Sequence, residues 1–143
     1  KRSSTFDTME TLIGRWQLNG RAFQSAGSRF TLRQNHPFLN EDQQHAILLV
    51  QVLMSNLYST SDFPESYRPE TWGEWHSIHR WSASEITKVD YFSPHTFGIH
   101  FRQEEEAYIA ICNLQSKAHD FSYMEQLIPL DPYEVVILRK LEE

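Results

Sequence analysis

The chain is poor in cysteine: only Cys112 occurs among its 143 residues. One cysteine cannot form an intrachain disulfide, and no Cys-x-x-Cys or cysteine–histidine pattern for a zinc ion accompanies it. This composition excludes a disulfide-stapled or zinc-stapled domain. We therefore predict a reducing, cytoplasmic setting, with no metal and no other cofactor.

An excess of basic residues is also missing, since 13 lysines and arginines stand against 19 aspartates and glutamates, a formal charge of -6. Such a charge repels phosphate backbones and anionic lipid headgroups. The longest apolar run, residues 46–57, is interrupted by Gln51 and Ser55 and is too short to span a bilayer. The sequence therefore predicts that neither nucleic acid nor a membrane is a partner.

Helical periodicity is present in the first 82 residues. Apolar side chains recur at helical spacing from Phe6 to Trp16, which predicts a first helix. Asn40 followed by Gln43 resembles a capping box, which opens a second helix expected over residues 41–57. That helix has almost no polar face, so it must be covered nearly all round.

Two further elements complete this half of the chain. Pro69 is expected to start a third helix, which carries Trp72, Trp75 and His79. One short strand, residues 30–33, is expected between the first and second helices.

From Ser82 the apolar pattern changes to a period of two, which is typical of strands. Turn-forming or charged residues separate the apolar segments, as short antiparallel connections require. The sequence thus predicts an α+β fold, with a helical part over residues 1–82 and an antiparallel β-sandwich-like unit over residues 83–143. The expected strands are 86–92, 96–103, 107–114, 119–123, 126–129 and 134–141.

Candidate metal-binding and catalytic groups in this chain have ordinary structural interpretations. His76 and His79 lie at i and i+3 near Glu74, but a zinc site needs further ligands that the sequence does not designate. The acidic run 104–106 falls in a predicted hairpin turn, and Asp62 follows the second helix as a capping residue. We expect the tryptophans of the third helix to pack in the core, although their ring faces could also stack on sugars.

Four segments of the first half resemble the last strand and last helix of the (β/α)8 barrel in α-galactosidases of glycoside hydrolase families 36 and 27. The final segments of the chain are similar, less specifically, to the β-sandwich that follows such barrels. The segments of the first half are Gly20-Arg21-Ala22-Phe23, Phe30-Thr31-Leu32-Arg33-Gln34-Asn35, Leu39-Asn40-Glu41-Asp42-Gln43-Gln44-His45 and Ser59-Thr60-Ser61-Asp62-Phe63-Pro64-Glu65-Ser66-Tyr67. Those of the second half are Tyr108-Ile109-Ala110-Ile111-Cys112-Asn113-Leu114 and Pro132-Tyr133-Glu134-Val135-Val136-Ile137-Leu138.

The resemblance implies a retaining hydrolase that acts on α-linked sugars through two aspartates about 5 Å apart. Both aspartates belong to strands earlier in the barrel, so we expect no catalytic residue in this chain. The family has Asn-Asp-Pro-Asp before its last strand, where this chain has Ser25-Ala26-Gly27-Ser28 without a carboxylate. Ser25 and Ser28 are therefore the expected sugar-binding positions.

Two hypotheses from different classes fit these features. In the first, residues 1–82 are the last β/α elements of a TIM barrel, residues 83–143 are its C-terminal antiparallel β domain, and the parent enzyme binds an α-galactoside or a related oligosaccharide. In the second, the chain is a free-standing glycan-binding or protein-interaction β module. Because a cut barrel would leave the apolar helix and the strand without partners, we also expect a homo-oligomer.

Overall fold

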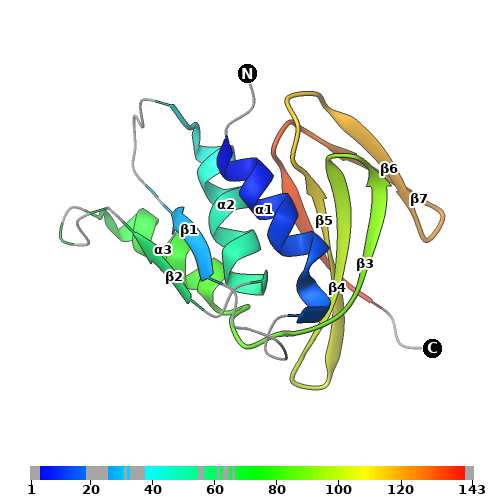
Figure 1. Cartoon of the computed structure of the whole chain (residues 1–143), viewed down its shortest axis with the longest axis horizontal. Coiled ribbons are helices and arrows are strands. Elements are labelled where there is room, and N and C mark those ends of the chain that lie inside the picture. The colour runs from blue at the N-terminus through cyan, green and yellow to red at the C-terminus, as the bar shows by residue number, and fades with distance from the viewer. Residues whose placement is uncertain are drawn as a thin grey trace. The chain divides into compact units, whose positions relative to one another are not determined.

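The computed structural model describes residues 4–18, 26–30, 32, 38–54, 57–60, 62, 65 and 67–140. For residues 4, 5, 8, 18, 26–30 and 57–60 it describes the backbone only. The chain divides into two compact units, which meet in the sequence between Ser84 and Glu85. The first unit contains helices and a parallel strand pair and the second contains antiparallel strands, so the predicted α+β class is confirmed (Figure 1).

The first unit is built around α2. Its elements are α1 (Ser4–Gly14), the short 3-10 helix η1 (Trp16–Leu18), β1 (Ala26–Phe30), α2 (Glu41–Met54), β2 (Leu57–Thr60) and α3 (Pro69–His79). Every residue from Ala46 to Met54 is buried, as the lack of a polar face predicted. The chain therefore covers this helix itself, and the expectation that α2 would be left open is wrong.

The predicted capping box at the start of α2 is confirmed. The Asn40 side-chain oxygen accepts a hydrogen bond from the Gln43 backbone N–H at 2.8 Å. The Gln43 side-chain oxygen in turn accepts one from the Asn40 N–H at 2.9 Å. These two bonds satisfy donors that the first turn of a helix leaves without intrahelical partners. The helix begins at Glu41 as expected but ends at Met54, three residues before Leu57.

The strands β1 and β2 pair in parallel, with α2 as the connection between them. Parallel neighbours need such a crossover, because a tight turn can only reverse the chain. The strand expected at residues 30–33 was placed wrongly, since β1 occupies Ala26–Phe30. The strand β2 (Leu57–Thr60) was not predicted, and its first residue, Leu57, was expected to be the last residue of α2.

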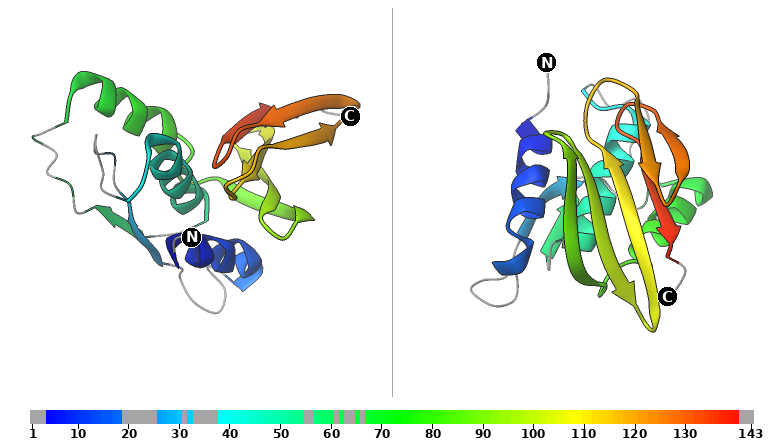
Figure 2. Two further views of the ribbon diagram at one scale, coloured as in Figure 1. Left: turned by 90° about the horizontal axis from the view of Figure 1, so that it is seen from above. Right: turned by 90° about the vertical axis from the view of Figure 1, so that its right-hand side faces the viewer.

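The second unit contains the six predicted strands, each within two residues of its expected ends. They are β3 (Glu85–Ser93), β4 (Thr96–Gln103), β5 (Glu106–Asn113), β6 (His119–Tyr123), β7 (Gln126–Leu130) and β8 (Val135–Arg139). Four of them form an antiparallel sheet in the order β3-β4-β5-β8, and β6 and β7 form a separate hairpin (Figure 2).

The hairpin packs on one face of the four-stranded sheet. Ile109 and Ile111 of β5 form a buried cluster with Phe121 of β6 and Leu130 of β7, and the partly buried Val136 and Leu138 of β8 pack against it. On the same face, Gly98 lets the Phe92 ring approach closely, since a Cβ atom at that position would lie 3.0 Å from Phe92 Cε2. This two-layer packing buries Ile109 and Ile111 completely. The neighbouring Ala110 and Cys112 are equally buried, so this part of β5 does not alternate between buried and exposed residues.

Candidate functional site

A functional site is expected at the carboxyl ends of β1 and β2, because parallel β/α units bind ligands where their strands end and their helices begin. Asp62, which follows β2, holds this region together. Its Oδ2 atom accepts hydrogen bonds from the backbone N–H of Leu32, two residues after β1, at 2.7 Å and from the Tyr67 hydroxyl at 2.5 Å. Asp62 is only 9% exposed, and these two bonds tie together the segments that leave the two strands.

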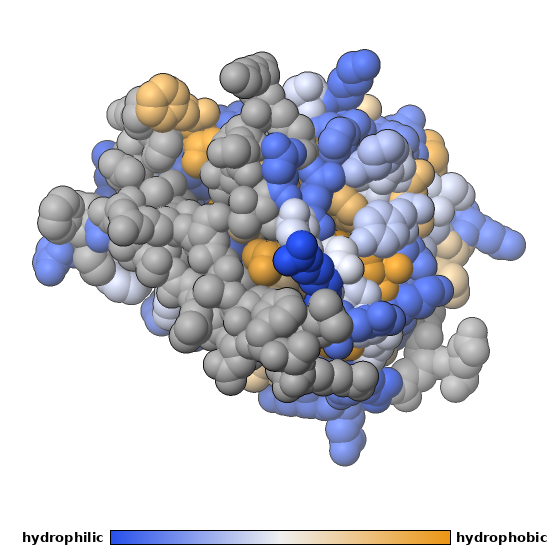
Figure 3. Space-filling view, viewed as in Figure 1, coloured by the Kyte–Doolittle hydropathy of each residue, from blue (hydrophilic) through white to orange (hydrophobic). Residues whose placement is uncertain are grey.

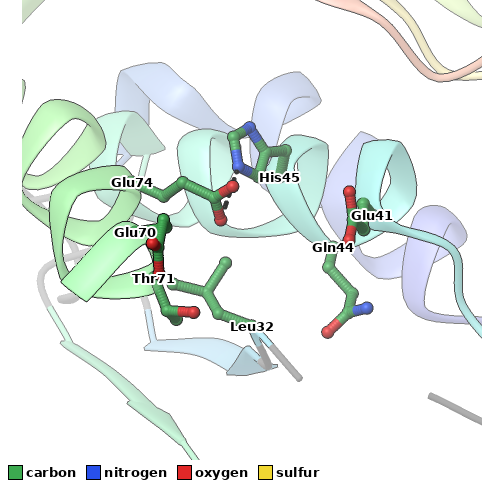
Figure 4. Close-up of a pocket in the computed structure, with 7 residues that line it drawn as sticks. All are labelled: Leu32, Glu41, Gln44, His45, Glu70, Thr71 and Glu74. Carbon is green, nitrogen blue, oxygen red and sulfur yellow. Dashed lines mark ion pairs between the residues drawn. The ribbon is translucent and has the colours of Figure 1, made fainter. Parts of the chain in front are cut away.

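A small pocket lies in this region, between the first turns of α2 and α3 (Figure 4). Glu74 reaches from α3 toward α2, where its Oε2 atom lies 3.2 Å from His45 Nε2. The cavity volume is about 50 Å³. Its lining residues are Leu32, Glu41, Gln44, His45, Glu70, Thr71 and Glu74.

The pocket is acidic and offers mostly hydrogen-bond acceptors. Glu41 and Glu70 belong to the first turns of α2 and α3, where the helix dipole favours negative charge. A water molecule has a share of roughly 30 Å³ in the liquid, and sites for whole small molecules run to several hundred Å³. The pocket is therefore large enough for water or one hydroxyl or amino group, but not for a whole sugar ring.

An array of aromatic rings lies on and beside α3, and we call it the α3 aromatic strip: Tyr67, Trp72, Trp75, His76 and His79. Trp72 contacts Tyr67 edge to face at 5.4 Å between centroids, and Trp75 stacks on His79 at 4.2 Å and 14°. Trp72 is 38% exposed, and Trp75 is half-buried. The prediction that these tryptophans are core residues is therefore wrong, because Ile78 is the buried residue of this helix.

No family model, curated protein or solved structure matches the chain. A function for this chain must therefore be argued from its residues and their geometry.

The two serines expected to meet a sugar are not placed by this structure. Ser25 lies outside the described residues. Ser28 lies in β1, of which only the backbone is described. The expectation that Ser25 and Ser28 bind a sugar therefore stays a prediction.

The histidines of α3 take part in ring contacts. Glu74, which the sequence places near His76 and His79, instead pairs with His45. Among the residues that the structure describes, no group of three or more His, Cys, Asp or Glu side chains could hold a metal ion. His45 gave little signal in the sequence, because it is the last of five polar residues that begin α2.

Cys112 is not available for chemistry. It is fully buried in β5, and burial raises the pKa of its thiol to about 12. Since the thiolate is the reactive form, this cysteine stays protonated and inert in the folded protein.

Proposed function

We propose that this chain is the C-terminal, non-catalytic part of a retaining glycoside hydrolase of the α-galactosidase type. The observation that carries the proposal is the parallel β1–α2–β2 crossover followed by a separate antiparallel β unit. A (β/α)8 barrel consists of repeated crossovers of this kind. The sequence resemblance implies the end of such a barrel, followed by a β-sandwich domain. On this proposal, residues 1–82 are the last barrel elements and residues 83–143 the C-terminal domain.

The Asp62 bonds support the same proposal. Barrel enzymes build their sites from the loops at the carboxyl ends of the strands, so these loops need a fixed geometry. Asp62 joins the segment after β1 to the segment after β2 through the Leu32 N–H and the Tyr67 hydroxyl. Its role here is to position those loops, and the catalytic groups belong to other strands of the parent.

We place the parent enzyme in the cytoplasm, acting on an α-galactoside or a related oligosaccharide. The free, buried Cys112 fits a reducing compartment, although it does not require one. In the part of the chain that the structure describes, no helix is long and apolar enough to cross a membrane.

Hydrolysis of nitrophenyl α-galactoside by the purified chain tests the non-catalytic assignment. We expect no turnover, because the oxocarbenium-like transition state needs both a carboxylate nucleophile and an acid. Turnover that persists through successive purification steps and scales with the amount of chain would overturn it.

The α3 aromatic strip favours a second candidate function, direct glycan binding by this chain. Flat aromatic rings bind the apolar faces of pyranoses, and the half-exposed Trp72 lies next to Thr71, which lines the acidic pocket. The same strip could instead contact another protein chain.

Tryptophan fluorescence distinguishes these possibilities. For glycan binding, we expect saturable quenching by an α-galactoside such as raffinose, weakened about tenfold or more in Trp72→Ala, as for loss of a central aromatic contact. Trp81→Ala is the matched control, because Trp81 lies outside the strip with the Arg80 guanidinium 4.4 Å from its ring centroid. Equal affinities of the two variants, or no quenching at millimolar sugar, would exclude the strip as a sugar site.

A further inference from the structure

A buried histidine connects three strands of the antiparallel sheet. His100 on β4 is 7% exposed, and both of its ring nitrogens have partners. Its Nε2 lies 2.7 Å from Asp90 Oδ2 on β3, and its Nδ1 lies 2.8 Å from the Nζ atom of Lys140, which follows β8. Because β5 lies between β4 and β8, the Lys140 side chain reaches across one strand to make this bond.

The partners of His100 determine its protonation state. A lysine ammonium group can only donate hydrogen bonds, so His100 Nδ1 must be an unprotonated acceptor. The Asp90 carboxylate can only accept, so His100 Nε2 must carry the proton. The observed arrangement is therefore that of a neutral imidazole in one fixed tautomer.

Charged side chains lie around the neutral His100 ring. Lys88, which pairs with His100 in the β3–β4 ladder, lies 3.2 Å from the Asp90 carboxylate. Desolvation opposes the shift, but hydrogen bonds from His100 and then Lys88 lower the pKa of Asp90, so this carboxylate stays charged.

Tyr123 of β6 also lies near these charges. Partial burial is the main cause that raises the pKa of its phenol, and the Asp90 charge raises it further. On the β5 side of His100, the paired residues carry no charge. They are Ile109 of β5, opposite His100, and Leu138 of β8, opposite Ile109. Arg102, two residues along β4, donates to the Glu105 backbone oxygen. The His100 ring thus lies between the Asp90 carboxylate, which also contacts Lys88, and the Lys140 ammonium group.

We propose that His100 is a pH-sensitive latch that holds the end of β8 on the sheet. Histidine is the side chain whose charge ordinarily changes between about pH 5 and 8. When Nδ1 gains a proton it can no longer accept from Lys140, and the new positive charge repels the ammonium group. The imidazolium keeps its bond to Asp90, so acid releases Lys140 while the β3–β4 contact remains.

The backbone at Lys140 provides a direct readout. Its N–H donates to the Ala107 carbonyl at 2.8 Å, one residue beyond the last residue of β8. Loss of the side-chain bond leaves this backbone bond as the nearest attachment of Lys140 to β5. We therefore expect the Lys140 amide to open more often once His100 is protonated.

Hydrogen exchange, corrected for the intrinsic pH dependence, tests the latch. Between about pH 7.5 and 5.5, we expect the protection of the Lys140 amide to fall roughly tenfold or more, the effect of losing one hydrogen bond to a charged donor. His100→Gln is the matched variant, because glutamine can donate and accept but does not titrate in this range. Its protection should be the same at both pH values, and an equal fall in this variant would overturn the proposal.

A second variant keeps the test decisive if His100→Gln does not fold. Lys140→Met retains the length of the side chain but removes the ammonium donor. We expect low protection at both pH values and no further loss in acid. Nitrogen NMR of the wild type should show His100 protonated at Nε2 and bare at Nδ1 at neutral pH, and the opposite tautomer would also contradict the latch.

Discussion

Asp62 is the residue on which the local geometry of the first unit depends most. Its Oδ2 atom accepts both the Leu32 N–H and the Tyr67 hydroxyl in a site with little solvent. We predict that Asp62→Asn lowers the free energy of unfolding by about 2 kcal/mol, because hydrogen bonds to a charged group are worth more than neutral ones. Urea denaturation measures this difference.

Tyr67→Phe is the matched control for that prediction. It removes only the hydroxyl donor and leaves the Leu32 bond to Asp62 in place. We expect it to cost about 1 kcal/mol, near the value of one ordinary hydrogen bond. An Asp62→Asn protein that is no less stable than Tyr67→Phe would contradict the role given to the carboxylate.

Gln51 of α2 lowers the stability of the protein. It is fully buried, and in the described part of the chain neither its side-chain nitrogen nor its side-chain oxygen has a hydrogen-bond partner. A buried polar group without a partner costs about 1 to 3 kcal/mol, so Gln51→Met should raise the midpoint of urea unfolding by about that free energy.

Gln44 provides the comparison, because it lies two helical turns earlier on the same side of α2. It is also buried, but its amide nitrogen donates to the Leu39 carbonyl at 3.3 Å. Gln44→Met should therefore give no gain. If both substitutions stabilise equally, the absence of a partner is not the cause.

At the scale of elements, the β6–β7 hairpin has a turn that its residues disfavour. Met124 and Glu125 form the two-residue loop with φ of 50° and 63°. Turns with both central residues at positive φ prefer Asn-Gly, because other side chains collide with the backbone there. We predict that Met124→Asn combined with Glu125→Gly stabilises the second unit by about 1 to 2 kcal/mol, measured by thermal unfolding.

The β4–β5 hairpin supplies the control for this change. Glu104 has a φ of 58°, whereas the next residue, Glu105, does not have a positive φ. Glycine at position 104 should therefore stabilise the protein, and glycine at position 105 should not, since its added freedom only favours the unfolded chain. A gain from Glu105→Gly would show that φ is not the reason.

Much of the second unit could be predicted from the sequence, because each of its strands and turns is marked by neighbouring residues in the chain. Period-two alternation and explicit turn residues placed all six strands, and Asn40 with Gln43 placed the start of α2. The parallel pair was not predictable in this way. β1 is the short segment Ala-Gly-Ser-Arg-Phe, β2 has only four residues, and their pairing depends on a partner beyond a whole helix.

The sites were harder to predict than the strands for the same reason. His45 meets Glu74, and His100 meets Lys140, only after distant segments are brought together. No motif marks either pair, because a side-chain contact between two elements needs no fixed spacing in the sequence. Asp62 was noticed through the resemblance, yet its bond to Leu32 is visible only in the structure.

At the scale of the whole molecule, burial of α2 changes the expected route to self-association. Leu49 and Leu53 are only 7% and 5% exposed within one chain, so this helix does not need a second copy to cover it. On the face shown in Figure 3, the hydrophobic residues of the coloured surface form scattered spots among hydrophilic ones. A homo-oligomer remains a proposal, and its interface would use surfaces other than α2.

Cysteine labelling tests this view of α2. We predict that Leu49→Cys and Leu53→Cys remain unreactive toward a thiol reagent in the monomeric fraction identified by light scattering, because the chain itself shields them. Ser122→Cys, at an exposed position of β6, should react at once. Rapid labelling of the two leucine positions in the monomer would restore α2 as an open interface.

We propose that this chain continues a β/α barrel, and the reading frame that precedes Lys1 in the gene tests this most directly. We predict several hundred codons in the same frame, whose product alternates strands and helices with barrel periodicity and contains two aspartates at the ends of strands. A start codon immediately before Lys1, or an upstream product without that alternation, would contradict the account and leave the chain as a free-standing module.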